Sequence, residues 1–334
     1  MPSEIPEVDA DCLSDMVLRA TDKLEPVIVR GVASDLPVVN ASNAGDRALL
    51  DYLLTFARPA EVTIVHAGEE VQGKFGYTPD LSAFNFKRIK AAFPDFLHAL
   101  QGSKFPPGAV AIQGVQTDVA APGFSEANAL PFLPDGGEYR MWLGTRAEVA
   151  IHCDPAPNVA FVAAGKRRFT LFAPEEIGNL YLGPFDPVPS GTQISLADPM
   201  APDLARFPRF AGALERSRSA ELRAGDAIFI PTGWYHHVQA RAPLNLLINY
   251  WWRSRHEGPS PWDALMHGFM TLRGLPPAER RVWRAMFNHY IFEDDGYPGE
   301  HIPAGRRGIL EHPTPQMLGA MREAVLRSLS ESIP

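Results

Sequence analysis

The stretch that decides the fold runs IHCDPAPN over residues 151–158. His152 and Asp154 interrupt an apolar run that is typical of a buried strand. Because residues i and i+2 of a strand point to the same face, these two side chains would converge on one point, whereas Cys153 would face the other way. Imidazole and carboxylate groups are strong metal ligands. The stretch therefore predicts two ligands of a metal site, with a third ligand on another strand.

We expect the third ligand in GDAIFIPTGWYHHVQA, residues 225–240. This stretch passes through an apolar strand, a Pro-Thr-Gly turn and two aromatic residues before it reaches His236 and His237. Two histidines and one carboxylate make the facial triad that suits non-haem Fe(II), and this triad leaves coordination positions open for oxygen and substrate. The two stretches together predict a metal centre inside one β core.

The composition is that of a globular chain. Of the 334 residues, 46% are hydrophobic, which is enough for a sizeable core in one large domain or two small ones. A net charge of −8 without a basic block argues against a nucleic-acid partner. We expect no membrane association, because no apolar run approaches the roughly 20 residues of a membrane span. The first residues lack a signal-peptide pattern and the only cysteines are Cys12 and Cys153, which predicts a reducing cytoplasm.

The pattern of apolar residues changes twice along the chain. From Tyr139 to Trp252, short apolar or alternating runs such as NVAFVAAG dominate, which is typical of an antiparallel sandwich or barrel. Strand patterns at 25–39 and 61–68 precede this part, together with a helical pattern at 46–57, and further helical patterns follow it. We expect a mainly β protein with flanking helices in three parts: an α/β N-terminal region at 1–138, a β core with the metal site at 139–256 and a helical region at 257–334.

The order of these motifs resembles that of a known family. The HxD of residues 152–154, the IPTGWYHHV segment and NYWW at 249–252 are similar to the motifs of JmjC-type, cupin-like hydroxylases, which include bacterial cupin-like proteins and the asparaginyl hydroxylase that inhibits hypoxia-inducible factor. The resemblance covers about residues 139–252, and EPVIVRGV at 25–32 resembles the usual start of the family. It implies a double-stranded β-helix (jelly-roll, cupin) core and an enzyme that uses Fe(II), 2-oxoglutarate and O2.

The resemblance assigns the iron ligands to His152, Asp154 and His236. His236 is preferred over His237 because the family's ligand directly follows the paired aromatic residues. His237 is then a structural or outward-facing residue. The reaction implied is the hydroxylation of a C–H bond, coupled to the decarboxylation of 2-oxoglutarate to succinate.

The resemblance also implies residues that hold the cosubstrate 2-oxoglutarate. Asn158 and Asn249 match two polar positions that line its site, and Gln113 corresponds to a glutamine that faces substrate or cosubstrate. Many relatives hold the far carboxylate with a lysine two residues after a strand glycine, where this chain has Arg167. Arginine can bind a carboxylate bidentately, so we favour Arg167; Lys166 is the rival if the strand carries a bulge.

Three functions are compatible with these motifs. The first is a 2-oxoglutarate oxygenase that acts on a protein side chain or a small molecule, and the second is a cupin metalloenzyme that does not use 2-oxoglutarate. The third is a non-catalytic binding module that holds a ligand without turnover. Apolar stripes in the C-terminal helices, with Leu265, Phe269, Trp283 and Phe287, predict either a homodimer face or a cover for one end of the core.

Overall fold

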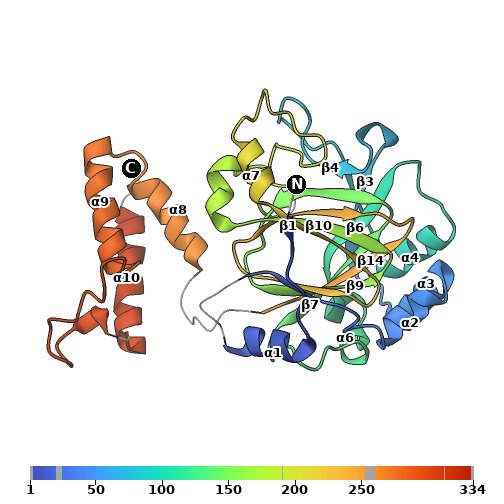
Figure 1. Ribbon diagram of the computed structural model, residues 1–334, viewed down its shortest axis with the longest axis horizontal. Helices are drawn as coiled ribbons and strands as arrows, with labels where there is room; N and C mark the ends of the chain where they lie inside the picture. The colour runs from blue at the N-terminus through green and yellow to red at the C-terminus, as the bar shows by residue number, and fades with distance from the viewer. Residues whose placement is uncertain (1–2, 20–24, 190, 253–259, 312, 332–334) are drawn as a thin grey trace. The chain divides into compact units, whose positions relative to one another are not determined.

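The computed structural model describes residues 3–19, 25–189, 191–252, 260–311 and 313–331 (Figure 1). It divides into two compact units, Met1–Arg255 and His256–Pro334. The first unit is mainly β, with two sheets and flanking helices, as predicted. Strands from residues 1–138 join the same sheet as strands from 139–256, and the three-part division of the chain stays a prediction.

The smaller sheet has six strands in the order β1-β11-β10-β13-β8-β4. Its neighbouring central strands are antiparallel, and the edge strands β1 and β4 run parallel to their neighbours. The central strands bring segments distant in sequence together, which places the two predicted ligand stretches side by side. The bounds are β1 (Ser3–Glu4), β4 (Lys74–Phe75), β8 (Ala147–His152), β10 (Lys166–Phe172), β11 (Arg218–Arg223) and β13 (Tyr235–Ala240).

The larger sheet has eight strands in the order β2-β12-β9-β14-β7-β6-β3-β5, and every neighbouring pair is antiparallel. Both sheets are open, so the core is a pair of stacked sheets and not a closed barrel. The bounds are β2 (Val27–Val29), β3 (Glu61–Ala67), β5 (Lys87–Ala92), β6 (Ala109–Gln116), β7 (Glu138–Gly144), β9 (Asn158–Ala164), β12 (Ala227–Ile230) and β14 (Asn245–Trp251).

Alternation along the strands builds two apolar layers. In β9, Val159 and Phe161 pack against the N-terminal helices, whereas Ala160 and Val162 pack between the two sheets. Because both faces are covered, this strand is a continuous apolar run. Figure 1 shows the helices α1, α2, α3, α4 and α6 gathered beside the larger sheet. Their bounds, with α5, are α1 (Ala10–Arg19), α2 (Pro37–Asn43), α3 (Asp46–Phe56), α4 (Phe93–Gln101), α5 (Thr117–Ala120) and α6 (Phe124–Ala127).

A smaller cluster covers part of the outer face of the six-stranded sheet. Ile151 of β8 and Tyr235 of β13 pack there against Leu180 and Phe210. Leu180 follows the 3-10 helix η2 (Pro174–Asn179), and Phe210 begins α7 (Phe210–Arg216). A second 3-10 helix, η1 (Glu69–Val71), precedes β4. The outer face of β8 and β13 is therefore partly core, even though it points away from the other sheet.

The strand predicted at 25–39 is shorter than the apolar pattern indicates. It ends at Val29, and Pro37 begins helix α2. Gly31 has a φ of 66°, which a side chain rarely adopts, so the chain turns there. Proline at the first helical position has the φ that a helix needs, and this overrides the β-branched character of Val38 and Val39.

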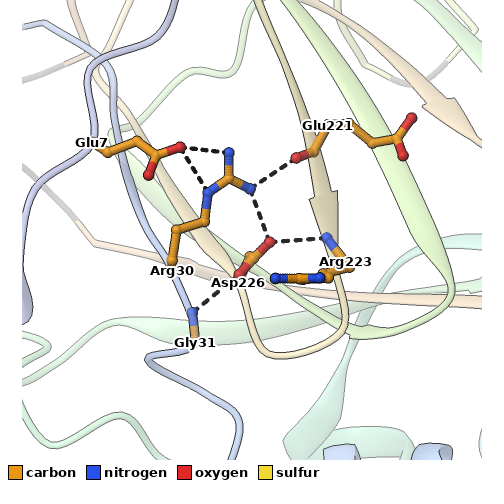
Figure 2. Close-up of polar contacts among 6 residues, drawn as sticks. All are labelled: Glu7, Arg30, Gly31, Glu221, Arg223 and Asp226. Carbon is orange, nitrogen blue, oxygen red and sulfur yellow. Dashed lines mark hydrogen bonds and ion pairs between the residues drawn. The ribbon is translucent and has the colours of Figure 1, made fainter.

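Asp226, in the turn between β11 and β12, ties the N-terminal segment to the core (Figure 2). This buried carboxylate accepts hydrogen bonds from Nη1 of Arg30 at 2.9 Å, from the Gly31 backbone N–H at 3.0 Å and from the Arg223 backbone N–H at 3.1 Å. Arg30 also donates to Glu7. The Gly-Asp pair that opens the 225–240 motif thus holds the turn before the strand and fixes β2 against β12.

The second unit consists of helices α8 (Pro261–Thr271), α9 (Pro277–Tyr290) and α10 (Pro315–Glu331) with the 3-10 helix η3 (Gly308–Leu310). Helices α8 and α9 have no buried residue, and apolar side chains of both line a cavity of about 620 Å³. Trp283 is 41% exposed and Phe287 is 38% exposed. Within the described residues, no helix has the length and apolar character to cross a membrane.

Candidate metal centre

The structure brings His152, Asp154 and His236 together between the two sheets. His152 ends β8 and lies opposite His236 of β13 in the strand register. The Nε2 atom of His152 is 3.9 Å from Oδ1 of Asp154, and Nε2 of His236 is 3.7 Å from Oδ2 of the same carboxylate. One ligand atom from each of the three residues lies within 4.8 Å of the others, so a single ion can contact all three. These side chains belong to different segments, as the two motifs predict.

A β-bulge in β8 aims His152 at this point. Val149 pairs with Val238 and His152 pairs with His236, so Ala150 and Ile151 together lie opposite one residue of β13. Val149 and His152 can therefore both face the interior, although an uninterrupted strand would send them to opposite faces. The strand ends at His152, so Asp154 approaches from the following loop. The predicted convergence is present, but strand alternation is not its cause.

Both histidines are held with Nε2 available as a ligand atom. The Nδ1 atom of His152 lies 2.8 Å from the carbonyl oxygen of Ala150, and Nδ1 of His236 lies 3.1 Å from that of Trp234. A carbonyl can only accept, so each Nδ1 carries the hydrogen and each Nε2 keeps its lone pair. This is the arrangement by which proteins fix the orientation of metal-binding histidines.

Burial favours a cation at this point. Desolvation, followed by repulsion from His152, lowers the pKa of His236 well below its ordinary value, so its imidazole is neutral near pH 7. Desolvation raises the pKa of Asp154, and the charges of His152 and Arg140 oppose this effect. A divalent ion would compensate the buried carboxylate and could bind the neutral imidazole of His236. The donor set of two imidazoles and one carboxylate fits Fe(II).

Asn158 and Asn249 form a short chain behind Asp154. Asn158 donates from Nδ2 to Oδ2 of Asp154 at 3.0 Å, and Asn249 donates from Nδ2 to Oδ1 of Asn158 at 3.0 Å. Both amides are buried, and Oδ1 of Asn249 has no partner within the described residues. The amide of Asn158 thus orients the carboxylate. Contact with a cosubstrate, the role predicted for both residues, stays a prediction.

Arg167 points into the space between the sheets, and Lys166 does not. Arg167 is 5% exposed and donates from Nη2 to the carbonyl oxygen of Trp142 in the opposite sheet at 3.3 Å. Its Nε has no partner in the described part of the chain. Burial without a carboxylate lowers its pKa to about 10. Lys166 lies on the exposed face of the same strand. A buried guanidinium with an unused donor is the feature that a carboxylate ligand would complete.

A cavity of about 420 Å³ adjoins the triad. His152 and Asp154 line it, and so does the half-buried Gln113. The sequence reasoning missed Arg140 and Trp142, which also line it and alternate toward the interior along β7. The remaining polar and apolar lining residues include Thr63, Val65, Arg88, Val149, Pro189, Thr192 and Trp251. Arg140 and Trp142 are two residues apart in EYRMWLG, so they share one face of the strand. This shared face is the sequence signal that could have identified both residues.

A known family model matches most of this chain. Residues 16–258 match the family model described as "Cupin-like domain". The chain belongs to the cupin-like family. The resemblance to JmjC-type members and the double-stranded β-helix core are thereby confirmed, since the match spans most of both sheets.

Several curated proteins are similar to parts of this chain. The lysine-specific demethylase JMJ31 of Arabidopsis thaliana is 29% identical over 154 residues, which are 46% of this chain and 26% of that protein. HSPB1-associated protein 1 of Rattus norvegicus is 33% identical over 119 residues, 35% of this chain and 24% of that protein. The human bifunctional peptidase and (3S)-lysyl hydroxylase JMJD7 is 27% identical over 167 residues, 45% of this chain and 51% of its own. The chain thus spans about a quarter of the length of the first two.

Proposed function

We propose that this cupin-like protein is an Fe(II)- and 2-oxoglutarate-dependent oxygenase that hydroxylates a C–H bond of a protein side chain or a small molecule. The observation that carries the proposal is the triad of His152, Asp154 and His236, in which both Nε2 atoms are directed at the Asp154 carboxylate. The names of two similar proteins, a lysine-specific demethylase and a lysyl hydroxylase, support oxidative chemistry in this family.

The chain's own residues would divide the work between binding, orientation and exclusion of water. When bound, the ferrous ion and 2-oxoglutarate would supply the oxidation of the C–H bond, with succinate and carbon dioxide as co-products. The triad would hold the ion on one side, and Asn158 would keep the Asp154 carboxylate in place. Arg167 would bind the far carboxylate of the cosubstrate. Trp142 and Val149 would limit water in the cavity.

A turnover assay tests this proposal. Purified protein is supplied with Fe(II), ascorbate and 2-oxoglutarate, and succinate release is measured across peptide and metabolite libraries. We expect succinate release that a substrate stimulates and that the Asp154→Ala variant lacks. Asp295→Ala, which removes an exposed carboxylate in the second unit, is the matched control and should retain full turnover. Full succinate release by the Asp154→Ala variant would refute the proposal.

The two rival functions give different outcomes in the same assay. A cupin metalloenzyme that does not use 2-oxoglutarate would bind Fe(II) through the triad but release no succinate with any substrate. A binding module would show neither metal-dependent turnover of the library nor succinate release. The unused Nε donor of the buried Arg167 favours the oxygenase, because a buried cation without an anionic partner costs free energy. The carboxylate of 2-oxoglutarate would supply that partner.

We also propose that two copies of the chain associate through the second unit and that the protein acts in the cytoplasm. The exposed apolar side chains of α8 and α9, including Leu265, Trp283 and Phe287, support an interface between copies. Cys12 and Cys153 are both free, which supports a reducing compartment.

A further inference from the structure

A second group of metal-ligand side chains lies on the outer face of the strands that carry the triad. Glu148 of β8, His237 of β13 and Asp198 place one ligand atom each within 4.8 Å of the others. The Nε2 atom of His237 is 3.3 Å from Oε2 of Glu148. Because side chains alternate along β13, His236 faces the interior and His237 faces outward. The two groups therefore lie back to back across one sheet.

The outer group is enclosed enough to hold an ion. His237 is 2% exposed, and its Nδ1 has no partner in the part of the chain that the structure describes. The side chains of Glu148 and Asp198 are 19% and 30% exposed. Gln239 donates from Nε2 to Oε1 of Glu148 at 3.2 Å, which leaves Oε2 directed at His237. The group therefore offers one imidazole and two carboxylates from three separate segments.

The group brings two carboxylates together beside one lysine. The hydrogen bond with His237 lowers the pKa of Glu148. Burial acts to raise the pKa of Asp198, but hydrogen bonds from Lys74 and from the Met200 backbone together hold it below its ordinary value. Both carboxylates are therefore ionised near pH 7. Lys74 contacts one of them, with its Nζ 2.5 Å from Oδ2 of Asp198.

A cavity of about 230 Å³ adjoins the group. Glu148, Asp198 and His237 line it together with Lys74, Tyr77 and Leu196. An ion held by the three ligands would keep coordination positions open toward this space. The cavity also gives the lysine side chain, which is 38% exposed, room to move aside.

We propose that Glu148, Asp198 and His237 bind a second divalent transition-metal ion, of the Zn²⁺ or Mn²⁺ class. The ammonium group of Lys74 competes with this ion for the carboxylate of Asp198. An imidazole beside two carboxylates suits these ions better than Mg²⁺ or Ca²⁺, which prefer oxygen ligands throughout. The site shares no ligand with the iron triad, so metal binding there can be tested independently of the oxygenase activity. The Lys74–Asp198 ion pair is its form without metal.

Metal stoichiometry separates the two sites. The full chain is dialysed to equilibrium against Zn²⁺ alone, and bound zinc is measured per chain. We expect two equivalents for the unchanged protein, one for Asp154→Ala and one for Asp198→Asn, with none for the double variant. Asp295→Asn, which alters the exposed His289–Asp295 pair, is the matched control and should keep both equivalents. A single equivalent that Asp154→Ala abolishes, or two equivalents in Asp198→Asn, would overturn the second site.

Substitution of the lysine tests the competition. In Lys74→Met the outer carboxylates lose their competing cation, so Zn²⁺ affinity at the outer site should rise by about fivefold, the equivalent of one partly exposed ion pair. Measuring this in the Asp154→Ala background removes the contribution of the triad. If the four residues formed an ion-pair network only, Lys74→Met would leave Zn²⁺ binding absent in that background. Thermal melting of each variant shows whether the fold is retained.

Discussion

Arg167 is a cation in the apolar layer between two sheets, where a guanidinium without a carboxylate costs free energy. Phe169 and Leu171, which follow it on the same face of β10, are fully apolar neighbours. Its one described hydrogen bond, to the carbonyl oxygen of Trp142, leaves Nε unused. Binding of the cosubstrate carboxylate, the role proposed for Arg167, would offset this cost.

Replacing Arg167 by methionine should separate binding from stability. Arg167→Met removes the donor for the cosubstrate carboxylate, so the KM for 2-oxoglutarate should rise by roughly tenfold to a hundredfold, as expected for a charge-assisted bond. The melting temperature should be unchanged or higher, because a buried cation is lost. Lys166→Met on the exposed face is the matched control and should change neither value. A large fall in melting temperature with an unchanged KM would contradict this role.

Asn158 acts through the carboxylate that it orients. Asn158→Ala removes the hydrogen bond to Oδ2 of Asp154, and we expect Fe(II) affinity to fall by about tenfold to a hundredfold, the usual effect of losing such a partner. Competition between Fe(II) and a chelator, measured without 2-oxoglutarate, gives this affinity directly. If Asn158 served the cosubstrate alone, Fe(II) affinity would stay the same and only the KM for 2-oxoglutarate would rise.

At the scale of single elements, the bulge in β8 and the turn at Asp226 decide how the ligand strands lie. The alternation in YHHV correctly predicts that His236 and His237 face opposite sides, because β13 has no interruption among the described residues. The bulge in β8 depends on which residues of β13 lie opposite, and this pairing is not encoded in the local pattern of AEVAIH. The sequence thus predicts the inward direction of His152 without its physical cause.

The turn at Asp226 should contribute measurably to stability. Asp226→Ala leaves the guanidinium of Arg30 and the backbone N–H groups of Gly31 and Arg223 without their acceptor, so the free energy of unfolding should fall by about 2–3 kcal/mol. Urea denaturation of the full chain measures it. Glu61→Ala, which breaks the exposed pair with Lys90, should cost no more than about 0.5 kcal/mol. Equal effects of the two substitutions would refute the role of the turn.

At the scale of the whole molecule, the sequence predicts the layers better than the contacts between distant loops. Runs such as NVAFVAA identify the strands, because a strand that is covered on both faces needs apolar residues at nearly every position. Asp198 reaches Glu148 from an irregular segment whose path no periodic pattern describes. The sequence therefore does not reveal the outer metal-ligand group, although it predicts that His237 is a structural or outward-facing residue.

The proposed dimer makes a prediction for the second unit. Trp283→Asp places a charge among the exposed apolar side chains of α9, so a dimer formed through this unit should dissociate into monomers. Light scattering after size-exclusion chromatography gives the mass of each species. Val119→Asp, at an exposed apolar residue of the first unit, should leave the dimer intact. A monomeric unchanged protein, or a dimeric Trp283→Asp variant, would contradict the proposal.

The extra residue in β8 also constrains how this chain can vary. Deleting Ala150 or Ile151 would leave one residue between Val149 and His152, so His152 would still face the interior opposite His236 on an unbroken ladder. Closing the bulge with both residues kept would instead slip the register and put Glu148 and His152 on the same face of the strand. A homologue shortened by one residue here could therefore keep the inward histidine, whereas a homologue of unchanged length would lose one of the two side-chain positions if its strand became regular.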